Sequence, residues 1–248
     1  MKYFLFFCLI FYGCKVADLS QNKINIYTVG DSTMANKPLE NNNPERGWVQ
    51  MLAPFFNENV AIFNHAVNGR SSKSFRDLGH WQPVLNQLKK GDYVLIQFGH
   101  NDSKDTDPVR YTNPQTSYRY NLITYINEVR DKGATPILLS SIARRKFNDQ
   151  GVLLDAHGNY TLVARLVAQE FNVEFIDMQY LTEQLFLKYG VESSKKLVLN
   201  FEPGEHPYFP EGKTDNTHLT EFGATEIAKL FVDEMVKKNH PISKFLRM

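Results

Sequence analysis

The chain has 248 residues, of which 42% are hydrophobic and 22% charged, and its formal net charge at pH 7 is +1. A chain of this length can bury one substantial core, so we expect a single domain. The near-neutral balance lacks the excess of Lys and Arg typical of nucleic-acid-binding proteins, and we expect no nucleic-acid partner.

Residues 1–17 have the pattern of a signal peptide, with one lysine followed by an apolar run too short to span a bilayer. The pair Gly13-Cys14 is similar to the end of a bacterial lipoprotein signal, and cleavage near Ala17 is the alternative. We therefore expect a secreted, periplasmic or cell-surface protein with its folded domain in residues 18–248. Any contact with a membrane would be made through a lipid anchor at Cys14.

The rest of the chain alternates between two hydrophobic patterns. Short apolar runs typical of strands occur at 24–29, 60–66, 93–98, 136–141 and 173–177. Between and after them, apolar residues recur at helical spacing in 47–56, 75–88, 122–129, 162–167 and 222–235, with Gly79 interrupting the second of these segments. This alternation predicts an α/β fold, a three-layer α/β/α sandwich with a central parallel sheet of about five strands, flavodoxin-like in its arrangement.

Three of the predicted strands end in turns with polar or glycine residues. The first ends in Gly30-Asp31-Ser32-Thr33, the second is followed by Gly69, and the third is followed by Asn101. The carboxyl ends of parallel strands meet at one edge of a sheet, where open α/β sheets bind their ligands. The sequence therefore predicts that Ser32, Gly69 and Asn101 lie around one crevice.

Ser32 has the position of a nucleophile, and a nucleophilic serine needs a base, a group that orients the base, and donors for the developing oxyanion. Asp215 and His218 are three residues apart before the last helix, close enough for the carboxylate to reach the imidazole. Each motif alone also has an ordinary interpretation, because Gly-Asp-Ser is a common turn and His218 could bond the end of its own helix. The combination favours acyl transfer.

Four sequence blocks together resemble the GDSL or SGNH hydrolases: Gly30-Asp31-Ser32-Thr33, Asn68-Gly69-Arg70-Ser71-Ser72, Gly99-His100-Asn101-Asp102 and Asp215-Asn216-Thr217-His218. Within that superfamily they are most similar to the rhamnogalacturonan acetylesterase branch, which removes acetyl groups from pectin without a metal or another cofactor. The resemblance implies that Ser32 is the nucleophile, His218 the base and Asp215 its orienting acid. It also implies an oxyanion hole formed by the Ser32 N–H, Gly69 and Asn101.

The segment 190–217 is rich in polar, proline and glycine residues, and we predict a long loop there. Arg70, beside Gly69, could meet a substrate carboxylate, and Tyr208 and Phe209 in the long loop could support a sugar ring. These three are the predicted substrate-binding residues, and the predicted partner is an acetylated polysaccharide or oligosaccharide bound by a monomer.

Other functions remain open from the residues alone. An acetylxylan esterase, or another carbohydrate or lipid esterase of the same superfamily, would use the same four blocks. The His and Asp residues also include ligand types for a two-metal phosphoesterase, although the usual Asp-x-His and His-x-His pairs are missing. A non-catalytic sugar-binding module is the third alternative.

Overall fold

The computed structural model describes residues 23–247. The predicted signal peptide and Cys14 lie outside these residues. None of the helices within residues 23–247 combines the length and the apolar character that a membrane span requires.

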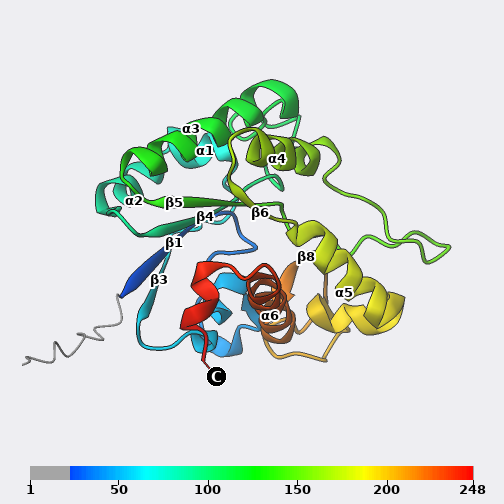
Figure 1. Cartoon of the computed structure of the whole chain (residues 1–248). Coiled ribbons are helices and arrows are strands. Elements are labelled where there is room, and N and C mark those ends of the chain that lie inside the picture. Colours follow the sequence, from blue (N-terminus) through cyan, green and yellow to red (C-terminus); the bar gives the residue numbers. More distant parts are fainter. Residues whose placement is uncertain (1–22, 248) are drawn as a thin grey trace, which may run out of the picture.

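A parallel sheet of five strands forms the centre of the molecule (Figure 1). Its spatial order is β3-β1-β4-β5-β6, with bounds β1 Ile24–Gly30, β3 Val60–Asn64, β4 Tyr93–Gln97, β5 Thr135–Leu139 and β6 Glu174–Ile176. The chain passes from β1 to β3 on one side and then returns to place β4 on the other side of β1. This reversal creates a switch point beside β1, where α/β sheets of this order bind ligands.

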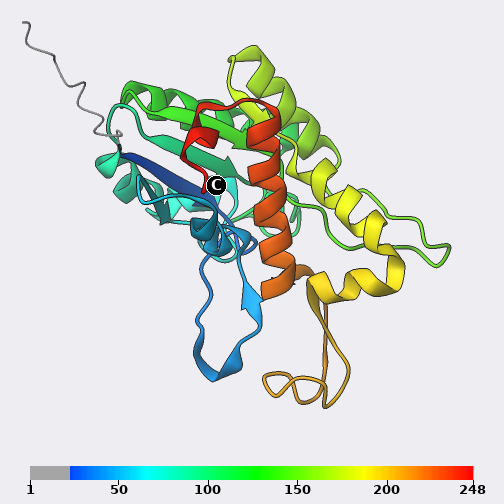
Figure 2. The ribbon, with the colours of Figure 1, turned by 60° about the horizontal axis from the view of Figure 1, so that its bottom comes forward.

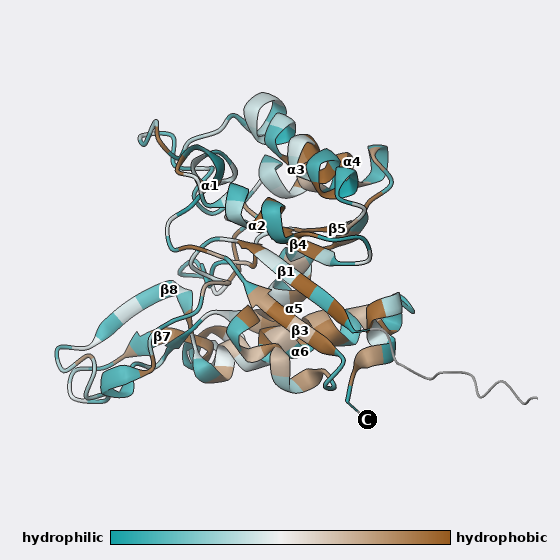
Figure 3. Ribbon diagram, turned by 90° about the vertical axis from the view of Figure 1, so that its left-hand side faces the viewer, coloured by the Kyte–Doolittle hydropathy of each residue, from teal (hydrophilic) through white to brown (hydrophobic). Residues whose placement is uncertain are grey.

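Helices cover both faces of the sheet, as Figure 1 shows. One face carries α1 (Ser72–Asp77), α2 (Trp81–Gln87), α3 (Arg119–Asp131) and α4 (Asn159–Glu170); the other carries α5 (Met178–Ser193) and α6 (Glu221–Lys237). Each side has its own buried core, because the side chains of β4 and β5 alternate between the two faces. Apolar residues accordingly concentrate in the strands and on the inner sides of the helices (Figure 3). The predicted three-layer fold is confirmed.

A second, antiparallel sheet was not predicted. It has the order β2-β8-β7, with bounds β2 Glu45–Arg46, β7 Val198–Phe201 and β8 Lys213–Thr220. Most of the segment interpreted as a long loop is therefore a hairpin, which extends away from the main sheet beside the segment that precedes β2 (Figure 2). β8 is mostly polar and half-buried, and β7 has only four residues, of which Val198 and Leu199 are buried, so neither strand shows the apolar alternation by which a half-buried strand is recognised.

Local details of the helices agree with the sequence in part. Gly79, at φ 78°, does separate α1 from α2. Thr220 caps α6 by accepting a hydrogen bond from the Gly223 N–H. The helix expected at 47–56 is instead two 3-10 turns, Trp48–Met51 and Ala53–Phe55, the second of which has Pro54 in its first turn.

Candidate active site

The turn after β1 holds Ser32 at the carboxyl end of the sheet. Asp31 is fully buried, and its Oδ1 accepts hydrogen bonds from the Thr33 N–H at 2.9 Å and from Thr33 Oγ1 at 2.8 Å. A Cβ on Gly30 would lie 2.4 Å from the Met34 sulfur and 2.8 Å from the Gln97 carbonyl oxygen, so only glycine fits. These contacts fix the backbone on both sides of Ser32.

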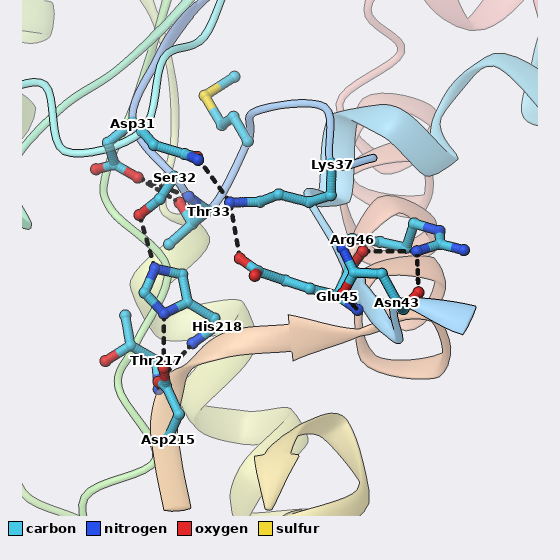
Figure 4. A network of polar contacts seen from close by, with 12 residues as sticks. Asp31, Ser32, Thr33, Lys37, Asn43, Glu45, Arg46, Asp215, Thr217 and His218 are labelled. Atoms are coloured by element: carbon cyan, nitrogen blue, oxygen red, sulfur yellow. Dashed lines mark hydrogen bonds and ion pairs between the residues drawn. The ribbon is translucent and has the colours of Figure 1, made fainter. Parts of the chain in front are cut away.

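Ser32, His218 and Asp215 form one chain of hydrogen bonds (Figure 4). His218 Nε2 lies 2.9 Å from Ser32 Oγ, and His218 Nδ1 lies 2.8 Å from Asp215 Oδ2. Ser32 follows the end of β1, and the other two residues lie on β8. His218 is 186 residues from Ser32 in the sequence. The structure thus brings together the predicted serine, base and acid, and it places the last two on β8, the strand that directly precedes the last helix.

The surroundings of Asp215 keep its carboxylate ionised. Burial alone would raise the pKa of Asp215, but hydrogen bonds from the His218 ring and backbone and from the Thr217 backbone outweigh burial and lower the pKa below its usual range. An ionised carboxylate can only accept hydrogen bonds, so Nδ1 carries the imidazole proton and Nε2 is free to accept from the Ser32 hydroxyl. This arrangement can withdraw a proton from Ser32.

Gly69 and Asn101 lie on the two loops that flank this chain. Gly69 has φ 72°, in the left-handed region that favours glycine. The buried Asn101 side-chain amide donates one hydrogen bond to the Arg70 carbonyl oxygen at 3.1 Å, and this bond ties the two loops together. A primary amide has two N–H donors, so one remains for another acceptor.

Asp102 fixes the relative position of these loops. Its buried carboxylate accepts hydrogen bonds from the Ser72 N–H at 3.1 Å, from Ser72 Oγ at 2.5 Å and from Thr112 Oγ1 at 2.8 Å. Burial raises the pKa of Asp102 to about 6, although these donors lower it. Asp31 and Asp102 therefore both brace turns at the carboxyl end of the sheet.

Lys37 connects two sides of the site and was not indicated by any sequence pattern (Figure 4). Its side chain is only 3% exposed, and Nζ lies 2.7 Å from Glu45 Oε1 and 2.7 Å from Asn68 Oδ1. Asn68 precedes Gly69, and Glu45 lies on β2, which pairs with β8 near His218. A single lysine in a polar segment has no spacing or flanking pattern that would single it out.

The predicted substrate-binding residues lie in two different places. Arg70 is half-buried beside Gly69, and its Nε donates to the Asn68 carbonyl oxygen at 3.2 Å. Tyr208 and Phe209 lie at the far end of the hairpin. Their ring centroids are 4.9 Å apart, edge to face, and the Phe209 ring stacks on that of Phe201. Their role in substrate binding stays a prediction.

Comparison with known proteins agrees with this geometry. The model of the GDSL-like lipase/acylhydrolase family matches residues 28–224, a span that includes all four sequence blocks. The chain belongs to this family. It is therefore a carboxylic ester hydrolase, and the predicted enzyme class is confirmed.

Two curated relatives of this acylhydrolase come from Bacillus subtilis. The rhamnogalacturonan acetylesterase RhgT is 36% identical over 92% of this chain and 96% of its own length. The probable rhamnogalacturonan acetylesterase YesY is 34% identical over 89% of this chain and 96% of its own length. The predicted resemblance to this branch of the superfamily is confirmed.

A solved structure with a similar fold is that of YxiM from Bacillus subtilis. It aligns with a TM-score of 0.73 and 26% sequence identity, covering 89% of this acylhydrolase and 58% of the YxiM chain. The similarity extends the agreement from the sequence blocks to the arrangement of the sheet and helices.

Proposed function

We propose that this acylhydrolase is a serine esterase that removes acetyl groups from plant cell-wall polysaccharide, with acetylated rhamnogalacturonan as its substrate. The observation that carries the proposal is the continuous hydrogen-bond chain from Ser32 through His218 to Asp215. The substrate is suggested by RhgT, which is named for this activity and is similar along nearly its whole length.

In the first step, Ser32 Oγ attacks the acetyl carbonyl carbon while His218 Nε2 takes the hydroxyl proton. The tetrahedral intermediate then collapses, and the sugar oxygen leaves with that proton. In the second step, water attacks the acetyl-enzyme with His218 again as the base, which releases acetate and restores Ser32. Asp215 holds the imidazole in the required tautomer and stabilises its protonated form.

The negative charge that develops on the carbonyl oxygen needs preorganised donors. We assign this role to the backbone N–H groups of Ser32 and Gly69 and to the side-chain amide of Asn101. Support comes from their placement on three loops that meet at the switch point of the sheet, and from the tether between Asn101 and the loop that carries Gly69.

The test is acetate release from acetylated rhamnogalacturonan, acetylated xylan and a small aryl acetate, each with the native protein and with Ser32→Ala. We expect the highest kcat/KM on rhamnogalacturonan and a loss of at least about 10³-fold in Ser32→Ala. Full activity in Ser32→Ala would disprove the mechanism. Activity on xylan alone would replace the substrate while leaving the chemistry intact.

The same proposal includes a location outside the cytoplasm, as a secreted, periplasmic or lipid-anchored surface protein. Its support is the sequence pattern of residues 1–17, since a polymeric cell-wall substrate must be met outside the cell. Cell fractionation of the native protein and of Cys14→Ala distinguishes the two routes. Release of Cys14→Ala from the membrane fraction would indicate an anchor at Cys14.

A further inference from the structure

Arg110 lies directly against the loop that carries Gly69. Its Nη1 is 3.9 Å from the position that a Cβ on Gly69 would occupy. Its Nε is held by Asp107 Oδ2, so the orientation of the guanidinium is fixed from the other side. This leaves the Nη groups of a half-buried arginine beside one of the proposed oxyanion donors.

Arg144 approaches the same region from the loop after β5. Its Nη1 donates to Thr217 Oγ1 at 2.5 Å, and its Nη2 donates to the His100 carbonyl oxygen at 3.4 Å. Thr217 is the neighbour of His218, and His100 is the neighbour of Asn101. The Arg144 guanidinium therefore lies between the loop of the base and the loop of the amide donor.

Lys104 is the third cation of this region. Its backbone N–H donates to the Asn101 carbonyl oxygen at 3.3 Å, and its side chain is half-buried. Burial lowers the pKa of Lys104, and the nearby charges of Arg110 and Arg144 lower it further. Across residues 23–247, neither Lys104 nor Arg144 forms an ion pair with a carboxylate. We call Lys104, Arg110 and Arg144 the cationic cluster.

The loop that carries Lys104 and Arg110 is closed firmly at its base. The Thr112 N–H donates to the Asp102 carbonyl oxygen at 3.1 Å, in addition to the contact of Thr112 Oγ1 with the Asp102 carboxylate. The single proton of the Tyr160 hydroxyl is directed between the carbonyl oxygens of both residues, at 3.0 Å from Asp102 and 2.6 Å from Thr112. The ends of the loop are thus set before any ligand arrives, which lowers the entropy cost of binding.

We propose that the cationic cluster binds the carboxylate of a uronic acid residue next to the acetylated sugar, and so gives the enzyme its preference for acidic polysaccharide. Arginine guanidinium groups match carboxylates in bidentate geometry, and two of the three cations lack an anionic partner of their own. The inference rests on the proposed function, because it places the carboxylate within reach of an ester bound at Ser32.

The first test compares Arg110→Gln and Lys104→Gln with the native enzyme on two substrates, acetylated rhamnogalacturonan oligosaccharide and neutral acetylated xylo-oligosaccharide. We expect each variant to lower the ratio of kcat/KM for the acidic substrate to kcat/KM for the neutral one by about tenfold, mainly through KM. Arg119→Gln is the matched control, because Arg119 is also paired with a carboxylate, that of Glu170, but lies on the outer helical layer. Its ratio should equal the native one.

Equal losses on both substrates would mean that the cations support folding or the chemical step, and would overturn the inference. Unchanged ratios in both variants would overturn it as well.

A second readout separates this inference from the proposed function. Deacetylated galacturonate oligosaccharides should inhibit aryl acetate hydrolysis competitively, more strongly than neutral xylo-oligosaccharides, and higher salt should weaken the inhibition. Arg110→Gln should raise the inhibition constant about tenfold, and Arg119→Gln should leave it unchanged. If the native enzyme releases no acetate from rhamnogalacturonan but shows this inhibition, the proposed substrate fails and the cluster stands. Equal inhibition by acidic and neutral oligosaccharides would overturn the cluster.

Discussion

Lys37 and Glu45 form a largely buried ion pair that connects the two halves of the site. Lys37 Nζ is 2.7 Å from Glu45 Oε1, with side-chain exposures of 3% and 23%. The same nitrogen donates to Asn68 at 2.7 Å. Because Asn68 leads into Gly69 and Glu45 lies on the strand beside β8, the pair fixes the loop that carries Gly69 relative to the strand that carries His218.

We expect Lys37→Met to lower both stability and activity. Removing one partner of a largely buried pair leaves the other uncompensated, and the partial exposure of Glu45 moderates the cost to about 2 kcal/mol of unfolding free energy. The activity loss should be in kcat, since without Lys37 the loop that carries Gly69 is no longer held in place, and this loop is proposed to act on the reacting atoms. Urea unfolding and steady-state kinetics measure the two effects.

Lys73→Met is the control for Lys37→Met. Lys73 forms an exposed pair with Asp77 on α1, and the loss of that pair should cost under about 1 kcal/mol. Similar losses of stability in both variants would show that the buried bridge has no special role.

Asn101→Ala tests the proposed side-chain donor of the oxyanion hole. Removing one such donor typically lowers kcat by about 10²- to 10³-fold. We expect a loss of this size with a nearly unchanged KM, because the donor acts on charge that exists only in the transition state. Asn86→Ala, on the exposed side of α2, should retain native kinetics. An Asn101→Ala enzyme with native kcat would remove Asn101 from the oxyanion hole.

The main sheet could be predicted from the sequence because its strands are short apolar runs that end at turn residues. The run at 93–98 is the clearest case, since β4 is covered on both faces and carries almost no polar residue. The site followed from the same rule, because residues after parallel strands meet at one edge. The prediction that Ser32, Asn101 and Gly69 lie together required no knowledge of side-chain contacts.

Features that depend on contacts between distant polar residues could not be predicted in this way. The strand β8 has polar residues on both of its faces, so it shows no apolar alternation. Its partner β2 has only two residues, both charged, and therefore has no hydrophobic signal either. Periodicity predicted a helix at 162–167 but did not show which of its apolar residues are buried, and Leu162 and Leu166 are 44% and 46% exposed on α4. Helical spacing locates an apolar stripe, but its outer edge faces solvent.

Asp215→Asn tests the orienting acid. The lowered pKa of Asp215 means that the carboxylate accepts from Nδ1 throughout the neutral range. An amide at this position can present N–H to Nδ1 instead, which would move the proton to Nε2 and leave nothing to accept from Ser32. We expect kcat to fall about 10⁴-fold with the fold retained. Asp149→Asn, in an exposed loop, is the control, and a loss below about tenfold at residue 215 would contradict this role.

The contribution of Asp215 to the stability of the folded protein also depends on pH. Its folded pKa is lower than the unfolded value of about 3.9, so its contribution is present above that value and is lost as the pH falls below it. Acidification from pH 7 to pH 5 should therefore leave this contribution unchanged.

His157 makes the stability of the folded protein depend on pH in a less acidic range than Asp215 does. It is buried, its Nε2 donates to the Ile142 carbonyl oxygen at 2.8 Å, and its ring contacts that of His100 at a centroid distance of 4.5 Å. Burial, with the nearby Arg144 charge, lowers the pKa of His157 to about 4, although the bond to Ile142 and the Asp155 charge raise it. The pKa of His100 is lowered well below its usual value, mainly by burial and then by the charge of His157.

Since the folded pKa of His157 is below the unfolded value of about 6.5, the unfolded state binds the proton first as the pH falls. The stabilising contribution is complete above pH 6.5 and declines between pH 6.5 and pH 4, by about 3 kcal/mol for His157. We expect His157→Asn to be less stable than the native protein at pH 7 and to lose less stability on acidification across this interval. Urea unfolding at a series of pH values measures the slope. His206→Asn, in the hairpin, should retain the native slope, and a native slope in His157→Asn would assign the acid sensitivity to other groups.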